Sequence, residues 1–161
     1  SQMLNIINSF PWLNLPEFNI VIFSFLLNFF WEMQQMPFFQ VSPEFTCVDV
    51  VNNCTLATVG DAGISLTAFI TVAVITKSRR WILQANWWQV GIFILVGIVI
   101  TIIFEALATG VLNRWKYSDV MPTLPVLGTG LLPVLQWLII PPLIIWFVRR
   151  QLLPIKRKSS S

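Results

Sequence analysis

The chain has 161 residues, of which 56% are hydrophobic and only 11% are charged, whereas a soluble domain carries about 25% charged residues. It has no histidine, which excludes His-dependent nucleophilic triads, His-ligated zinc and His-ligated haem, and its two cysteines are too few for an all-cysteine zinc site. The net charge of +3 comes from basic residues grouped as in membrane proteins, so nucleic acid is not an expected partner. The composition indicates an integral membrane protein and gives no sign of a cofactor or resident metal.

Residues 1–17 contain several apolar side chains, Trp12 and two prolines, but no Lys or Arg. We interpret them as an interfacial segment that lies on the membrane with Trp12 at headgroup level. A secretory signal peptide would begin with basic residues. A disordered terminal tail is the alternative interpretation.

Four long apolar stretches follow, and each is near or above the roughly 20 residues that a helix needs to cross a hydrocarbon core about 30 Å thick. Single segments in lipid satisfy their own backbone only as helices. The predicted fold class is therefore all-α, a polytopic membrane protein with a four-transmembrane-helix bundle (18–150) between the interfacial segment and a basic tail (151–161). The predicted spans are residues 18–36, 55–76, 87–112 and 125–148.

The basic residues are unequally divided between the two sides that these spans define. Only Arg114 and Lys116 lie on the side that holds the connection between the first and second spans and the connection between the third and fourth spans. The positive-inside rule therefore predicts that both termini are cytoplasmic, with the basic tail against anionic lipid. Membrane lipids are the expected partners, and other membrane subunits or a second copy are further candidates. The other eight basic residues are Lys77, Arg79, Arg80, Arg149, Arg150, Lys156, Arg157 and Lys158.

The two cysteines, Cys47 and Cys54, fall in one short outer loop under this topology. Thiols outside the cytoplasm usually oxidise, so we predict a disulfide between them. The alternative is a pair of small apolar residues at the rim of the bundle.

Each predicted span carries polar residues on one helical face, because residues three and four apart share a face. In every span these residues fall in the outer half. A carboxylate in lipid costs about 2.5–3.5 kcal/mol on insertion scales, and ionisable residues inside spans are functional candidates by default. The candidate catalytic groups are Glu32, Asp61 and Glu105, and the candidate substrate-binding groups in the spans are Asn28, Gln35 and Gln136.

Three carboxylates that face one small space cannot all ionise without a proton or a cation among them. Arg114 and Lys116 are the only fixed positive charges on that side, and Arg114 is the better bidentate partner for a carboxylate. Tyr117 adds a hydroxyl at the same level. We therefore predict an outward-opening pocket in which Arg114 and Tyr117 also contact the substrate. The alternative is that the polar groups only hold helices together.

Several stretches (NFFWEMQQMPFF, CTLATVGDA, FEALATG, NRWKYSDVMP and LLPVLQWLIIPPL) resemble a group of small bacterial integral membrane proteins of about this length. The resemblance spans nearly the whole chain and implies four spans in a bacterial inner membrane, without implying a chemistry. A shorter pattern, Asn28 with Trp31, Glu32 and Pro37, is similar to a helix of membrane-integrated terpenoid cyclases, in which a carboxylic acid protonates the substrate. Those proteins have more spans, and Asp61 or Glu105 would supply the second acid.

Three functions follow from these features. The first is acid–base chemistry on a lipid or isoprenoid taken from the outer leaflet, with Glu32 as the general acid or base and Asp61 or Glu105 as its partner. The second is a non-catalytic accessory subunit of a larger membrane complex, in which the polar groups fix helix packing. The third is a binder of a cation or an amphiphile, with carboxylates as hard oxygen ligands.

Overall fold

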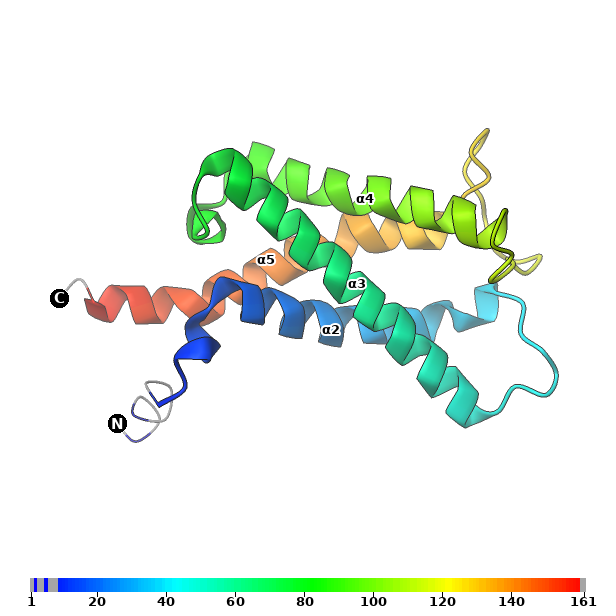
Figure 1. Ribbon diagram of the computed structural model, residues 1–161, viewed down its shortest axis with the longest axis horizontal. Coiled ribbons are helices and arrows are strands. Elements are labelled where there is room, and N and C mark those ends of the chain that lie inside the picture. Colours follow the sequence, from blue (N-terminus) through cyan, green and yellow to red (C-terminus); the bar gives the residue numbers. More distant parts are fainter. Residues whose placement is uncertain (1, 3–4, 6–8, 160–161) are drawn as a thin grey trace.

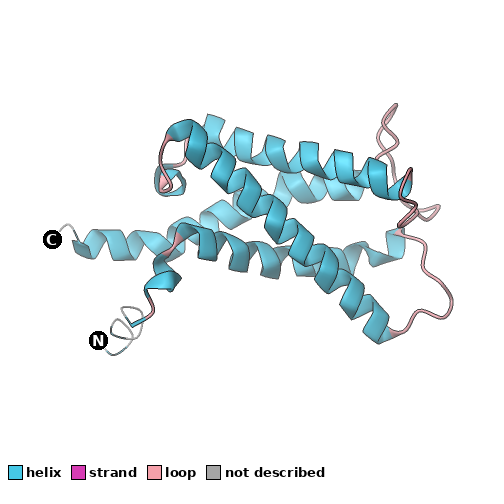
Figure 2. Ribbon diagram, in the orientation of Figure 1, coloured by secondary structure: helices cyan, strands magenta, loops and turns pink. Residues whose placement is uncertain are grey.

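The computed structural model describes residues 2, 5 and 9–159, with side chains up to Leu153, and over these residues the chain is helical with no strand. Four long helices, α2 (Pro16–Gln35), α3 (Cys47–Thr76), α4 (Trp87–Thr109) and α5 (Leu131–Ser159), run along one long axis (Figure 1). Loops and three short 3-10 helices join them, η1 (Pro11–Asn14), η2 (Met36–Phe38) and η3 (Trp81–Gln84) (Figure 2). The predicted all-α class is confirmed.

Three of these helices, α3, α4 and α5 up to Leu153, are long and apolar enough to cross a membrane. The surface agrees with this, because large apolar side chains such as Trp87, Leu56 and Phe30 are 91%, 72% and 67% exposed. Asn28, Ser24, Ser65 and other polar side chains are instead fully buried. An apolar exterior around a polar interior suits lipid as the surrounding solvent.

Two helix starts differ from the predicted spans. Helix α3 begins at Cys47, because Thr46 and Asp49 form a capping box in which each side chain accepts a hydrogen bond from the other's backbone N–H. Helix α5 begins at Leu131, because Val126 and Gly128 adopt positive φ angles of 69° and 68° that no α-helix accommodates. At its other end α5 continues to Ser159, through most of the predicted tail.

The four long helices form a ring in which α2 packs on α3 and α5, and α4 also packs on α3 and α5. The start of α2, the α3–α4 connection and the end of α5 lie at one end of this bundle, which we call the terminal end (Figure 1). The α2–α3 and α4–α5 connections lie at the opposite end, the loop end. Of the predicted interfacial segment, residues 1, 3–4 and 6–8 lie outside the described residues, as do residues 160–161 of the tail.

The interior is divided into two layers. An apolar core fills the half near the terminal end and includes Ile20 of α2, Phe69 of α3, Phe93 of α4 and Ile144 of α5. The connecting helix η3 belongs to this core, since Trp81 is 3% exposed and its Nε1 donates a hydrogen bond to the carbonyl of Phe69 at 3.1 Å. Most of the buried polar side chains gather in the other half, toward the loop end, and Asn19 and Gln89 near the starts of α2 and α4 are the exceptions.

Candidate functional site

One side-chain amide lies at the centre of the polar half. Gln136, on the second turn of α5, is 2% exposed, and its Nε2 lies 2.7 Å from Asn28 Oδ1, 3.1 Å from Asp61 Oδ2 and 3.3 Å from Glu32 Oε1. An amide nitrogen carries two hydrogens, so it serves at most two of these three oxygens well. Oxygens from α2 and α3 thus compete for one amide group of α5, which has too few hydrogens for all three of them.

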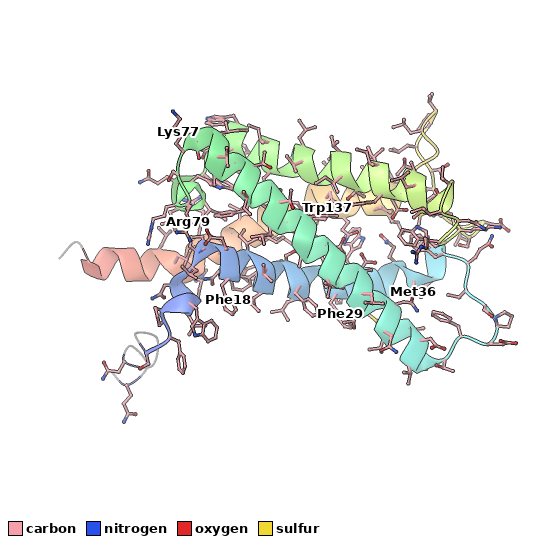
Figure 3. All side chains as sticks on the ribbon, in the orientation of Figure 1. Phe18, Phe29, Met36, Lys77, Arg79 and Trp137 are labelled. Atoms are coloured by element: carbon pink, nitrogen blue, oxygen red, sulfur yellow. The ribbon has the colours of Figure 1, made fainter. Side chains whose placement is uncertain are left out.

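The carboxyl groups of Glu32 and Asp61 both lie against the same Gln136 nitrogen, so the two acids are neighbours in the site. Glu32 is half-buried, whereas Asp61 is only 8% exposed. Among the residues that the structure describes, the single ion pair joins Arg79 to Glu17, and Arg79 lies at the terminal end, away from this site (Figure 3). No described cation therefore compensates the two carboxyl groups.

A chain of hydrogen bonds continues from the amide toward the middle of the bundle. Asn28 Nδ2 donates to the Ser24 carbonyl at 2.8 Å and to Ser24 Oγ at 2.9 Å, and Ser24 Oγ lies 2.7 Å from Ser65 Oγ. Residues 24, 28 and 32 are spaced by one turn on α2, and residues 61 and 65 by one turn on α3, so both rows face the same interior. The network joins α2, α3 and α5 through buried hydrogen bonds between polar side chains of different helices.

The third carboxylate, Glu105 on the last turns of α4, has its own partners. Its Oε2 accepts hydrogen bonds from Tyr117 OH at 2.5 Å and from Trp115 Nε1 at 3.3 Å. Trp115 was not predicted as a site residue, although residues 115 and 117 point to one side of any extended segment.

Tyr117 is held in place by the two loops of the loop end. Gln40 N–H donates to the Lys116 carbonyl and Ser118 N–H to the Phe38 carbonyl, both at 2.9 Å, so the chain after α2 pairs with the chain after α4. The Tyr117 ring also packs so closely against Gly130 that a Cβ there would lie 3.1 Å from the ring. Burial and the hydrogen bond to Glu105 raise the pKa of Tyr117 well above its usual range.

One further polar group in this half has no partner. The hydroxyl of Thr101 is buried on α4, one turn before Glu105 on the same face, and it has no hydrogen-bond partner among the described residues. A buried hydroxyl normally finds a partner, so an orphan of this kind marks a place where a water or a ligand group fits.

Three predicted site features differ from the structure. Arg114 is exposed and its side chain forms no ion pair within the described residues, whereas Trp115 and Tyr117 next to it contact Glu105. Gln35 is buried, but its Oε1 accepts a hydrogen bond from Trp31 Nε1 at 2.9 Å and does not join the Gln136 network.

The third difference is the predicted disulfide, which is not formed. Cys47 and Cys54 are both free thiols, the first exposed and the second buried. Both lie on helix α3, seven residues apart, which separates them by about 10 Å along the axis. A disulfide needs Cα atoms within about 7 Å.

Two hollows on the surface of the described residues lie away from the carboxyl groups of the site, and neither is lined by Glu32, Asp61 or Glu105. One, of about 300 Å³, is lined by Glu17, Phe69, Ile70, Ala73, Val74, Lys77, Ser78 and Arg79. The other, of about 360 Å³, is lined by Gln40, Val41, Ser42, Asn113, Arg114, Trp115 and Lys116. The carboxylates that we expected around an open pocket instead contact Gln136, Tyr117 and Trp115 directly.

Comparisons of the chain with protein-family models, with curated proteins and with solved structures found no match. The function is therefore argued from the geometry of the chain's own residues.

Proposed function

We propose that the chain is an integral membrane protein with four spans and that the Glu32–Asp61 pair performs acid–base chemistry on a lipid or isoprenoid. The observation that carries the proposal is the single Gln136 amide shared by two carboxyl groups and Asn28, with no described cation nearby. Two carboxylates so close together cannot both remain charged in lipid. One proton shared by the pair resolves this conflict.

Helix α2 is the fourth span in this proposal. Its 20 residues match the thickness of a bilayer. Its hydropathy is lowered by polar residues that never meet lipid, since Asn19, Asn28 and Gln35 are buried while Leu26 and Phe30 are 61% and 67% exposed. The orientation that fits the basic residues has the terminal end in the cytoplasm of a bacterium and the loop end outside.

A shared proton in a site with little water is suited to protonating an apolar substrate. The protonated member of the pair would add its proton to a carbon–carbon double bond, and the other carboxylate would take a proton from a neighbouring carbon. The substrate keeps its atoms, and the pair returns to one proton, so no co-reactant is consumed. Substrate from the outer leaflet is the natural choice because the pair lies toward the loop end.

The Glu32–Asp61 pair is not required to hold the helices together, which supports a role in chemistry. The neighbouring Ser24–Ser65 and Asn28–Gln136 hydrogen bonds already join α2 to α3 and α5 with neutral groups. Placing two carboxyl groups at the same helix contact costs free energy in lipid. The orphan hydroxyl of Thr101 adds a place for a ligand in the same half of the bundle.

The test uses a linear isoprenoid hydrocarbon as the probe, with the purified chain in lipid nanodiscs in D₂O. We expect the wild type to isomerise the probe or to introduce deuterium, as mass spectrometry and chromatography would show. Glu32→Gln keeps the size but cannot exchange a proton, so it should abolish both signals. Glu44→Gln, an exposed glutamate beyond the end of α2, removes the same charge and should leave both signals unchanged.

A second candidate function is that of a non-catalytic subunit of a larger membrane complex. It is favoured by the direct contacts among Gln136, Glu32 and Asp61, and by the position of both surface hollows elsewhere. In that case the wild type leaves the probe unchanged, and gentle purification from native membranes recovers stoichiometric partners that Glu32→Gln releases.

A further inference from the structure

We propose that the hollow at the terminal end is a binding site for one anionic glycerophospholipid. This hollow, which we call the basic hollow, lies between the start of α2 and the end of α3 and measures about 300 Å³. It is separate from the Glu32–Asp61 pair. The inference rests on membrane insertion of the chain and not on acid–base chemistry.

The floor of the basic hollow is apolar. Two consecutive turns of α3 supply it through Phe69, Ile70, Ala73 and Val74, because residues three and four apart share a helical face. Ile70 and Val74 are 47% and 71% exposed and have no partner that covers them within the described chain, whereas Phe69 and Ala73 beside them are buried in the apolar core. The volume takes only the glycerol end of a lipid, and the acyl chains would continue along Ile70 and Val74 into the bilayer.

The rim of the basic hollow carries Lys77, Arg79 and the carboxylate of Glu17, so its net charge is positive by one unit. Lys77 ends α3 in the left-handed region (φ 56°), and Arg79 follows two residues later. Arg79 Nε donates to Glu17 Oε1 at 2.6 Å, and this bond uses one of the five N–H groups of the guanidinium. The two terminal nitrogens have no hydrogen bond within the described residues, so they are free to bind a phosphate in the bidentate manner that arginine favours.

The place of the basic hollow matches a lipid headgroup. Lys77 and Arg79 lie at the terminal end, where α3 ends, and Phe18 near the start of α2 lies at the same end (Figure 3). Helix ends mark the membrane interface, where anionic headgroups attract Lys and Arg by about 1 kcal/mol each. An apolar floor below a cationic rim fits a phosphate above acyl chains better than it fits a free soluble anion.

The second hollow provides a matched comparison within the chain. Arg114 and Lys116 give it two positive charges as well, but Gln40, Ser42 and Asn113 make its lining polar. If charge alone held lipid, both hollows would behave alike. If the combination of floor and rim matters, only the basic hollow should retain a lipid.

The experiment measures lipid retained by the full chain in native mass spectrometry, after release from nanodiscs of phosphatidylcholine with a minor share of phosphatidylglycerol. We expect one phosphatidylglycerol to be retained in preference to phosphatidylcholine. Lys77→Gln with Arg79→Gln should lower this occupancy roughly ten-fold or more. Arg114→Gln with Lys116→Gln should leave it unchanged.

Two further variants separate binding from folding. Lys77→Gln alone keeps the Arg79–Glu17 ion pair and should weaken retention by a smaller factor. Val74→Trp keeps every charge but fills the floor from an exposed position, and it should also reduce retention. Equal retention of both lipids by the wild type, or equal losses from the two double variants, would overturn the proposal whatever the isoprenoid assay shows.

Discussion

Tyr117 is the residue whose ionisation reports most directly on the loop end. It is the only tyrosine of the chain, it donates to Glu105 and its ring packs against Gly130. Burial is the largest cause of the raised pKa of Tyr117, and the hydrogen bond to the Glu105 carboxylate is the next. Because the raised pKa favours the protonated phenol in the folded chain, this contribution to stability is complete below pH about 10 and is lost as the pH rises through the folded-state pKa.

We predict that tyrosinate absorbance of the folded protein in detergent stays absent at a pH of about 10, where an unfolded tyrosine is half-ionised. Glu105→Gln removes the charge next to the phenol and should move the titration toward that ordinary value. The unfolded chain is the control for complete titration. A half-ionised tyrosine near pH 10 in the folded wild type would contradict the contact.

Helical periodicity is sufficient to place Asn28, Glu32, Asp61 and Gln136 in one polar half, because it fixes which side chains share a face of each helix. It does not place Arg114, which lies in the irregular connection after α4, where no helical period applies. It also does not separate Gln35 from the network, since the neighbouring Trp31 offers a nearer hydrogen-bond donor. Side-chain choices between competing partners are decided by tertiary packing, which a sequence pattern does not describe.

At the scale of the helices, the contact between α4 and α5 depends on a small residue. A Cβ added at Gly97 would overlap the indole ring of Trp137, which is 1% exposed. Trp137 lies near the middle of the long axis of the bundle (Figure 3). The close approach of these two helices therefore requires glycine at position 97.

Gly97→Ala should destabilise the protein by about 1–3 kcal/mol, the usual cost of overpacking a dense core. Gly91→Ala on the same helix is the matched control, because a Cβ there meets no atom within 4 Å. It should be neutral or stabilising by about 0.5–1 kcal/mol, since alanine favours helix more than glycine does. Thermal unfolding in one detergent measures both, and equal effects of the two variants would refute the contact.

The long apolar runs predict α4, nearly all of α2, the later part of α3 and the earlier part of α5, because length and hydropathy are properties of the segment itself. The early start of α3 was missed, although Thr46 and Asp49 have the spacing of a capping box. The burial of η3 was also missed. Its sequence WILQ is too short for a periodic signal, and its burial results from contacts with α5 and α3.

For the whole molecule, the decisive property is which end faces the outside. We predict that reporter fusions after Arg80 and after Lys158 read as cytoplasmic, and that a fusion at Ser42 reads as external. The reason is the concentration of basic residues at the terminal end. An external reading after Arg80 would reverse the assignment of both ends.

The free thiols give an independent measurement of the same orientation. Cys47 is exposed and Cys54 is 1% exposed. A membrane-impermeant maleimide added to intact cells should therefore label Cys47 once per chain without prior reduction, and Cys47→Ser should lose the label. Labelling of Cys54 should require unfolding. If neither thiol reacts until a reductant is added, the two cysteines form the disulfide that the sequence predicts.

The division of the interior into an apolar and a polar half also has a consequence for biosynthesis. Helix α2 is made early, and it carries Asn28 and Glu32 into the membrane, whereas their partner Gln136 follows 108 residues after Asn28. At a synthesis rate of about 5–20 residues per second, that interval lasts about 5–20 s. During this time the polar face of α2 has only α3 to cover it. The nascent chain would therefore remain beside the insertion machinery, or beside a membrane chaperone, until α5 arrives and completes the ring.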